Sequence, residues 1–361
     1  MTNRFRLRFA HASLAMVATA FAVASAPAQA GFLSDAISKI LTLPSYGPIP
    51  NLLDNQPVAT DTCDVRNRAH TESATGDRIG VRQYGCVVNN RNVVFTVSIP
   101  KACETQHCGL IVDQHGATMN AEQQNKGTQL REWGWKAMGL GAPTPYIVVQ
   151  PNMTDLLDNQ TGQLDLKSVT GLPYTNELPA LLTFVHNIVQ SLQVDPRRVH
   201  FHGFSRGGFT ADKIYCDPAT RDLFASYVGS GAFLSCAVSR PFMQFIGLTD
   251  PNVALADAVA ATFHRAGAQS EMLHESPNWT TPSLQFVGLK PVLTGKYQHV
   301  RYTLGEHKLE VLRHSGAAIP LAGHCLPRQG PADWLVCPAD FDMGRKIVEF
   351  FIQNPVAPAT P

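Results

Sequence analysis

The sequence is poor in charged residues and has no excess of either sign. Only 16% of its 361 residues are charged, and 29 Lys and Arg stand against 28 Asp and Glu, a formal net charge of +1. So little charge excludes a coiled coil, and the balance favours neither a nucleic-acid partner nor an acidic tail. The 27 glycines have no three-residue period, which excludes collagen, and 44% hydrophobic residues exclude a disordered chain. We therefore expect a globular protein.

The apolar run near the N-terminus, Leu14–Ser25, is too short to span a bilayer comfortably. Three arginines precede it, and Ala28-Gln29-Ala30 matches the small-x-small pattern of a signal-peptide cleavage site. These features predict a signal peptide over residues 1–30 rather than a membrane anchor. The mature protein is then expected to be secreted, into either the periplasm or the medium.

The rest of the chain contains neither a Pro/Ser/Thr-rich linker nor a repeat of solenoid period. Residues 31–62 are Pro-rich and irregular, and we expect them to wrap the surface. Residues 63–361 are predicted to form a single domain.

The chain has no C-x2-C pair, so its cysteines do not resemble a zinc site, and no metal is expected. An even number of cysteines in a secreted protein instead predicts disulfides. Pairing sequence neighbours gives four bridges: Cys63–Cys86, Cys103–Cys108, Cys216–Cys236 and Cys325–Cys337.

Short apolar runs alternate with amphipathic stretches along this domain. Strands are predicted at Ile79–Val88, Asn92–Ile99, Gly109–Gln114, Tyr146–Gln150, Val199–Phe204, Ala225–Val228 and Met243–Leu248. Helices are predicted at Asn176–Leu192, Val253–Ala266 and Phe341–Ile352, and a hairpin within Val300–Leu312. Continuous apolar strands that alternate with helices predict an α/β fold, with a mostly parallel central sheet covered by helices on both faces.

The most specific motif is Gly203-Phe204-Ser205-Arg206-Gly207, a G-x-S-x-G sequence between an apolar strand and the start of a predicted helix. In such a strand–turn–helix the turn is so tight that only small residues fit beside the serine, whose hydroxyl is then exposed above the sheet. This context makes Ser205 a candidate nucleophile.

A serine nucleophile needs a base and an acid that orients the base, in the chain order Ser, Asp, His. Asp250 follows an apolar strand, where open α/β sheets carry their sites, although an Asp before Pro is also common in turns. His324 follows a glycine in a loop beyond the last predicted strand and is the candidate base. His314 is the alternative base. His200 and His202 form an H-x-H pair without an evident third ligand, which favours packing roles.

An oxyanion hole needs two converging backbone N–H groups. One is expected from Arg206, the residue after the nucleophile, and the other from the turn after an early strand. Ala117 in His115-Gly116-Ala117 is the candidate for this second donor, with Gly116 as its substitute. His115 is then expected to pack beneath the site.

Several segments resemble the α/β-hydrolase family: Val194–Val199, Gly203–Gly208, the His115-Gly116 turn, Thr249-Asp250-Pro251 and Gly323-His324. Within it, they are similar to secreted polyhydroxybutyrate depolymerase-like and feruloyl esterase-like serine esterases. The resemblance covers roughly residues 80–350 and implies an α/β-hydrolase fold and a triad of Ser205, His324 and Asp250. Arg206 departs from the small residue common in relatives, which implies a polar arm beside the site.

These observations predict a secreted serine esterase that needs no cofactor and acts on carboxylic esters, including oligomeric or polymeric polyesters. The alternatives are an amidase, peptidase or poly(amino acid) hydrolase with the same triad, and a silent hydrolase fold used for binding. Trp279 is a candidate substrate contact. Neither a nucleic-acid nor a membrane partner is expected, and the sequence indicates no oligomeric state.

Overall fold

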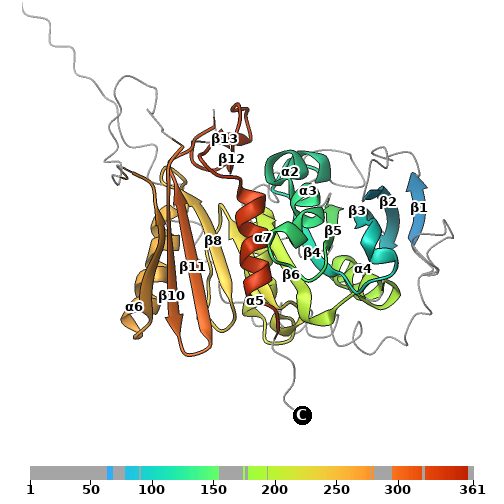
Figure 1. Cartoon of the computed structure of the whole chain (residues 1–361), viewed down its shortest axis with the longest axis horizontal. Coiled ribbons are helices and arrows are strands. Elements are labelled where there is room, and N and C mark those ends of the chain that lie inside the picture. Colours follow the sequence, from blue (N-terminus) through green and yellow to red (C-terminus); the bar gives the residue numbers. More distant parts are fainter. Residues whose placement is uncertain are drawn as a thin grey trace, which may run out of the picture. The chain divides into compact units, whose positions relative to one another are not determined.

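Buried strands that alternate with helices build one large sheet, shown in the computed structural model of the chain (Figure 1). The structure describes residues 63–67, 78–88, 91–153, 174, 178–192, 194–277, 279, 295–318 and 322–356. The predicted signal peptide over residues 1–30 and the irregular segment 31–62 lie outside these residues and stay predictions.

The sheet has eleven strands in the order β1-β2-β3-β5-β4-β6-β7-β8-β11-β10-β9. Their bounds are Cys63–Asn67 (β1), Arg78–Val88 (β2), Arg91–Pro100 (β3), Gly109–Gln114 (β4), Tyr146–Asn152 (β5), Val199–Phe204 (β6), Ser226–Ser230 (β7), Phe242–Gly247 (β8), Gln269–Glu275 (β9), Tyr297–Leu304 (β10) and His307–His314 (β11). A separate pair joins β12 (Leu326–Arg328) to β13 (Val336–Pro338).

The centre of the sheet is parallel and its two sides are antiparallel. The strands from β5 to β11 in the sheet order pair in parallel, whereas β1, β2 and β3 on one side and β10 and β9 on the other are added antiparallel. The α/β fold is confirmed, and the expected parallel sheet is correct for the centre only. Only two residues separate β2 from β3 and β10 from β11, and such hairpin connections give antiparallel neighbours.

Helices cover both faces of the sheet. They are α2 (Ala121–Thr128), α3 (Leu130–Trp135), α4 (Leu178–Ser191), α5 (Arg206–Cys216), α6 (Val253–Arg265) and α7 (Met343–Gln353). Among the residues that the structure describes, four 3-10 helices span Lys101–Glu104, Ala137–Leu140, Pro196–Arg198 and Arg221–Leu223. Helix α7 crosses the front of the sheet in Figure 1, and α2 and α3 lie on the same side. Helix α5 packs on β6 from the opposite face, since Gly203 of β6 contacts the α5 backbone.

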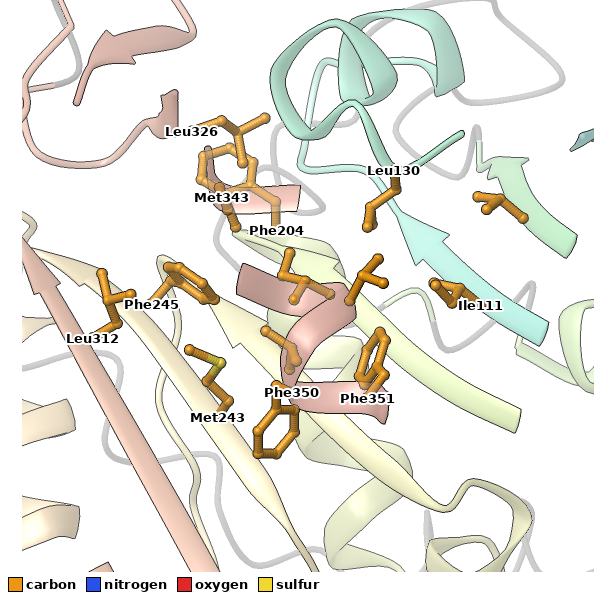
Figure 2. Close-up of a cluster of buried hydrophobic side chains, with 14 of the residues drawn as sticks. Ile111, Leu130, Phe204, Met243, Phe245, Leu312, Leu326, Met343, Phe350 and Phe351 are labelled. Carbon is orange, nitrogen blue, oxygen red and sulfur yellow. The ribbon is translucent and has the colours of Figure 1, made fainter. Parts of the chain in front are cut away.

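The core on the α7 side joins strand side chains to this last helix. Figure 2 shows Phe350 and Phe351 of α7 beside Met243 of β8 and Ile111 of β4. Phe351 also stacks on the ring of His200, with 4.5 Å between the ring centroids. The strand side chains there are fully buried, which explains why these strands are continuous apolar runs in the sequence.

Three of the four predicted disulfides are confirmed: Cys103–Cys108, Cys216–Cys236 and Cys325–Cys337. The fourth, Cys63–Cys86, joins two positions that the antiparallel register of β1 and β2 places opposite each other. The side chains of these two residues are not among those described, so this bridge stays a prediction.

The predicted hairpin is confirmed as β10 and β11, which turn at Gly305 with a φ of 59°. It is longer than expected, and β9 extends it into a three-stranded antiparallel unit. Among the described helices none is long and apolar enough to cross a membrane.

Candidate active site

Ser205 lies at the sharp turn between β6 and α5. Its φ of 53° and ψ of −117° are unusual for a residue other than glycine. The turn depends on small neighbours: a Cβ on Gly203 would collide with the backbone of Gly207. The strand–turn–helix predicted from G-x-S-x-G is therefore present, and it points the first N–H groups of α5 towards the serine.

The three residues expected to act together do lie together. His324 Nε2 is 2.8 Å from Ser205 Oγ, and His324 Nδ1 is 2.8 Å from Asp250 Oδ2. A carboxylate only accepts, so Nδ1 carries the proton and Nε2 accepts from the serine hydroxyl. Asp250 is buried, whereas 18% of the His324 side chain is exposed. This arrangement leaves the serine and the imidazole accessible above a buried acid.

Asp250 serves the turn as well as the histidine. Its Oδ1 accepts a 2.8 Å hydrogen bond from the backbone N–H of Asn252, which precedes α6. The Asn252 side chain in turn donates to the Gly231 carbonyl at 2.9 Å. Asp250 thus uses one oxygen, Oδ1, in the turn, as is common for an Asp before Pro, and the other, Oδ2, in the contact with His324.

The loop after β4 passes directly beside the serine. A Cβ on Gly116 would lie 3.1 Å from Ser205 Cβ, so the backbone of this loop approaches Ser205 closely. Ala117 follows, and Thr118 has a φ of 61°, an uncommon conformation that marks a tightly bent loop. The assignment of the Ala117 and Arg206 N–H groups to an oxyanion hole stays a prediction.

His115 is buried beneath this loop, as expected. Its Nε2 accepts from the Met153 N–H at 3.0 Å, and its Nδ1 is 2.7 Å from the Gly116 carbonyl. Burial lowers the pKa of His115 from 6.5 to about 4, so the ring is neutral. The Tyr174 hydroxyl donates to the same carbonyl at 3.0 Å.

The Arg206 side chain, for which the resemblance implied a polar arm beside the site, is buried rather than exposed. It is 2% exposed, and its guanidinium lies 4.2 Å from the centroid of the Tyr174 ring. The arginine therefore packs inward, where a cation over an aromatic face is favourable.

A polar network that the sequence did not predict lies in the sheet below Ser205. Asp113 of β4 is fully buried and accepts from His202 Nδ1 at 2.7 Å, Gln124 Nε2 at 2.7 Å, Gln150 Nε2 at 2.6 Å and Thr128 Oγ1 at 3.1 Å. Burial opposes the charge of Asp113, but the hydrogen bonds from His202, Gln124 and Gln150 hold its pKa below the ordinary value. The carboxylate is thus kept ionised inside the protein.

His314, the alternative base, is buried at the end of β11, and burial lowers its pKa from 6.5 to about 4. A ring nitrogen of His314 and the sulfurs of Cys325 and Cys337, atoms of the kinds that bind metals, lie within 4.8 Å of one another. These two cysteines are joined in a disulfide, so their sulfurs are not the thiolates that a metal requires. His324 rather than His314 contacts Ser205.

Trp279 follows β9, and its backbone N–H donates to the Ser276 carbonyl at 2.9 Å. Its role as a substrate contact stays a prediction.

The H-x-H pair is buried, as expected: His200 and His202 are both inaccessible, and each contacts a serine of β7.

No protein-family model matches the sequence, and no curated protein matches it. Several solved structures are similar to it in fold. A thermostable esterase has 15% identity and a TM-score of 0.37, over 50% of this chain and 52% of that chain. A ferulic acid esterase has 12% identity and a TM-score of 0.40, over 52% and 86% of the two chains. An acetyl xylan esterase from Aspergillus awamori has 13% identity and a TM-score of 0.41, over 74% and 97%.

The match to the thermostable esterase thus spans about half of that protein's length. The architecture of this chain is defined by its own elements: parallel central strands, helices on both faces, and a strand–turn–helix with a serine at its apex. The chain has the α/β-hydrolase fold.

Proposed function

We propose that the protein is a secreted serine hydrolase that cleaves carboxylic esters through Ser205, His324 and Asp250. The observation that carries this proposal is the continuous hydrogen-bonded chain from the Ser205 hydroxyl through the imidazole to the buried carboxylate. A serine is a weak nucleophile on its own, and this chain is what activates it.

In the proposed reaction His324 Nε2 takes the hydroxyl proton as Ser205 Oγ attacks the ester carbonyl carbon. Asp250 keeps the imidazole in the required tautomer and stabilises the imidazolium without taking its proton. His324 then gives the proton to the leaving alcohol, which leaves an acyl-serine. Water, activated by the same imidazole, attacks this acyl group and releases the acid and the free enzyme.

Negative charge develops on the carbonyl oxygen during both attacks. We assign its stabilisation to the N–H groups of Arg206 and Ala117. The first belongs to the N-terminus of α5, where the helix dipole also favours a negative charge. The second belongs to the loop that Gly116 brings against Ser205. Each such donor lowers the barrier by about 3–4 kcal/mol.

The proposed substrate class is a carboxylic ester, including the oligomers and polymers of hydroxyalkanoates that the sequence resemblance implies. The same three side chains can cleave an amide, which differs in its poorer leaving group. Secretion is part of the proposal and is supported by the disulfides, which persist in oxidising compartments.

The test is hydrolysis of p-nitrophenyl acetate, butyrate and octanoate by the mature protein, each compared with the matching p-nitroanilide. Ser205→Ala is the paired variant, and circular dichroism checks that it is folded. We expect ester hydrolysis by the wild type and none above background by the variant. Equal rates for the two proteins, or hydrolysis of the anilides alone, would overturn the proposal.

A further inference from the structure

The H-x-H motif of β6 has no part in the triad, yet its second histidine belongs to another serine–histidine–aspartate chain. His202 Nδ1 is 2.7 Å from Asp113 Oδ1, and His202 Nε2 is 2.9 Å from Ser230 Oγ. All three side chains are at most 1% exposed, so substrate cannot reach them. Because the Asp113 carboxylate only accepts, His202 Nδ1 donates to it, and in the neutral ring Nε2 accepts from the Ser230 hydroxyl.

Ser230 connects this buried chain to the nucleophile. Its backbone carbonyl accepts a 2.7 Å hydrogen bond from the Ser205 N–H. Ser205 has the backbone conformation φ 53°, ψ −117°, which costs energy and persists only where the surroundings impose it. The contact between His202 and the Ser230 hydroxyl fixes the residue whose carbonyl holds that strained backbone.

Asp113 connects the same chain to the other side of the site. It lies in β4, just before the loop that carries Ala117, and its carboxylate accepts from Gln124 and Thr128 of α2, just after that loop. Both ends of the loop are therefore attached to a single buried carboxylate. Three neighbouring strands, β4, β6 and β7, are linked in this way directly below the site.

We propose that Asp113, His202 and Ser230 form a positioning unit that sets Ser205 at the correct distance from the backbone N–H donors of the oxyanion hole. The inference rests on the proposed function, since it concerns the geometry of that same site. The three residues are positioning residues and touch neither the substrate nor the reacting atoms.

The chain contains a matched control on the same two strands. His200 Nδ1 is 2.9 Å from Ser226 Oγ, and both side chains are fully buried. Ser226 lies at the start of β7, opposite His200, whereas Ser230 lies at the end of β7, opposite Phe204 and next to the site. Removing either hydroxyl deprives one buried histidine of a partner, but only Ser230 is attached to Ser205.

The experiment compares Ser230→Ala with Ser226→Ala and includes Ser230→Thr, which keeps a hydroxyl. Active sites are counted by titration with a fluorophosphonate, so that kcat refers only to folded enzyme. We expect Ser230→Ala to lower kcat by about ten- to hundredfold, as small misplacements of reacting groups do, with KM unchanged within about twofold. Ser226→Ala should keep the wild-type kcat, and Ser230→Thr should recover most of it.

Asp113→Asn, which keeps the side-chain size, is the second variant and should also lower kcat and the rate of phosphonylation. The inference is overturned if Ser230→Ala and Ser226→Ala lose similar thermal stability and both keep the wild-type kcat per titrated site. A wild-type protein that reacts with neither ester nor fluorophosphonate would overturn the proposed function instead. The two failures are therefore distinguishable.

Discussion

Gly247 and Gly323 pack backbone to backbone, so closely that a Cβ on Gly247 would collide with the Gly323 carbonyl. Gly247 ends β8, the strand that leads to Asp250, and Gly323 immediately precedes His324. Asp250 and His324 therefore meet because the loop that carries His324 rests directly on the end of the strand that leads to Asp250. The contact is between main chains and leaves no space for a side chain on Gly247.

Gly247→Ala should displace the loop of His324 and lower kcat about a hundredfold, the usual effect of a misplacement near 1 Å. Gly139→Ala is the control, because a Cβ there would meet nothing within 4 Å. Both variants are assayed for p-nitrophenyl butyrate hydrolysis after their folding is checked. Full activity of Gly247→Ala would show that the close contact is not needed.

Asp250→Asn should keep the fold and lower kcat by about a thousandfold or more, because an amide donating to Nδ1 favours the wrong tautomer of His324. The measurement is kcat for an activated ester across a pH series, with active sites titrated. His314→Gln is the comparison that separates the two candidate bases. A fall in kcat for His314→Gln as large as for Asp250→Asn would contradict the assignment.

Removing the Cys325–Cys337 disulfide, as Cys325→Ala with Cys337→Ala, should lower the free energy of unfolding by about 3 kcal/mol. The Cys103–Cys108 bridge closes a shorter loop, with a sequence separation of 5 against 12, and its removal should cost about 2 kcal/mol. Only the first change should also reduce kcat, because Cys325 follows His324 directly. Urea denaturation and ester hydrolysis measure both effects, and equal losses of kcat would contradict this distinction.

Three buried histidines predict how stability depends on pH. Burial lowers the pKa of His115 and His314 from 6.5 to about 4, and that of His200 to about 3. Between pH 6.5 and 4 the unfolded chain binds protons that the folded chain does not, so the free energy of unfolding rises with pH in this window and falls on acidification. Each histidine contributes up to about 1.4 kcal/mol per pH unit.

Urea denaturation at pH 7, 6, 5 and 4 tests this dependence. His200→Gln is the informative variant, because it removes one of the three groups and should make the decline shallower. A slope equal to that of the wild type would show that His200 is not neutral in the folded state.

The centre of the sheet and the contacts of His324 with Ser205 and Asp250 could be predicted from the sequence because the signals there are local. The predicted bounds of β4 and β6 are the observed ones, and the G-x-S-x-G motif requires one particular turn. The order of Ser205, Asp250 and His324 then follows from the fold that this turn implies.

Two other kinds of element could not be predicted in the same way: a strand that is exposed on both faces, and helices that bury polar side chains. Strand β9 is exposed on both faces over most of its length, so it has no apolar alternation. Helices α2 and α3 bury Gln124, Asn125 and Arg131, which interrupt the apolar period of a helix. The partners of Asp113 come together only through the register of β4, β5 and β6, which depends on long-range pairing.

The position of α7 at the end of the described chain has a kinetic consequence. Its Phe351 shares one core with Ile111 of β4, so the part of this face under α7 is covered only after segments far apart in the sequence have met. Contacts of such long range form slowly, because a long loop must close before they contribute. In a chain that emerges N-terminus first, the part of this face that α7 covers thus stays exposed until α7 has been synthesised, and completion of this core is a late step of folding.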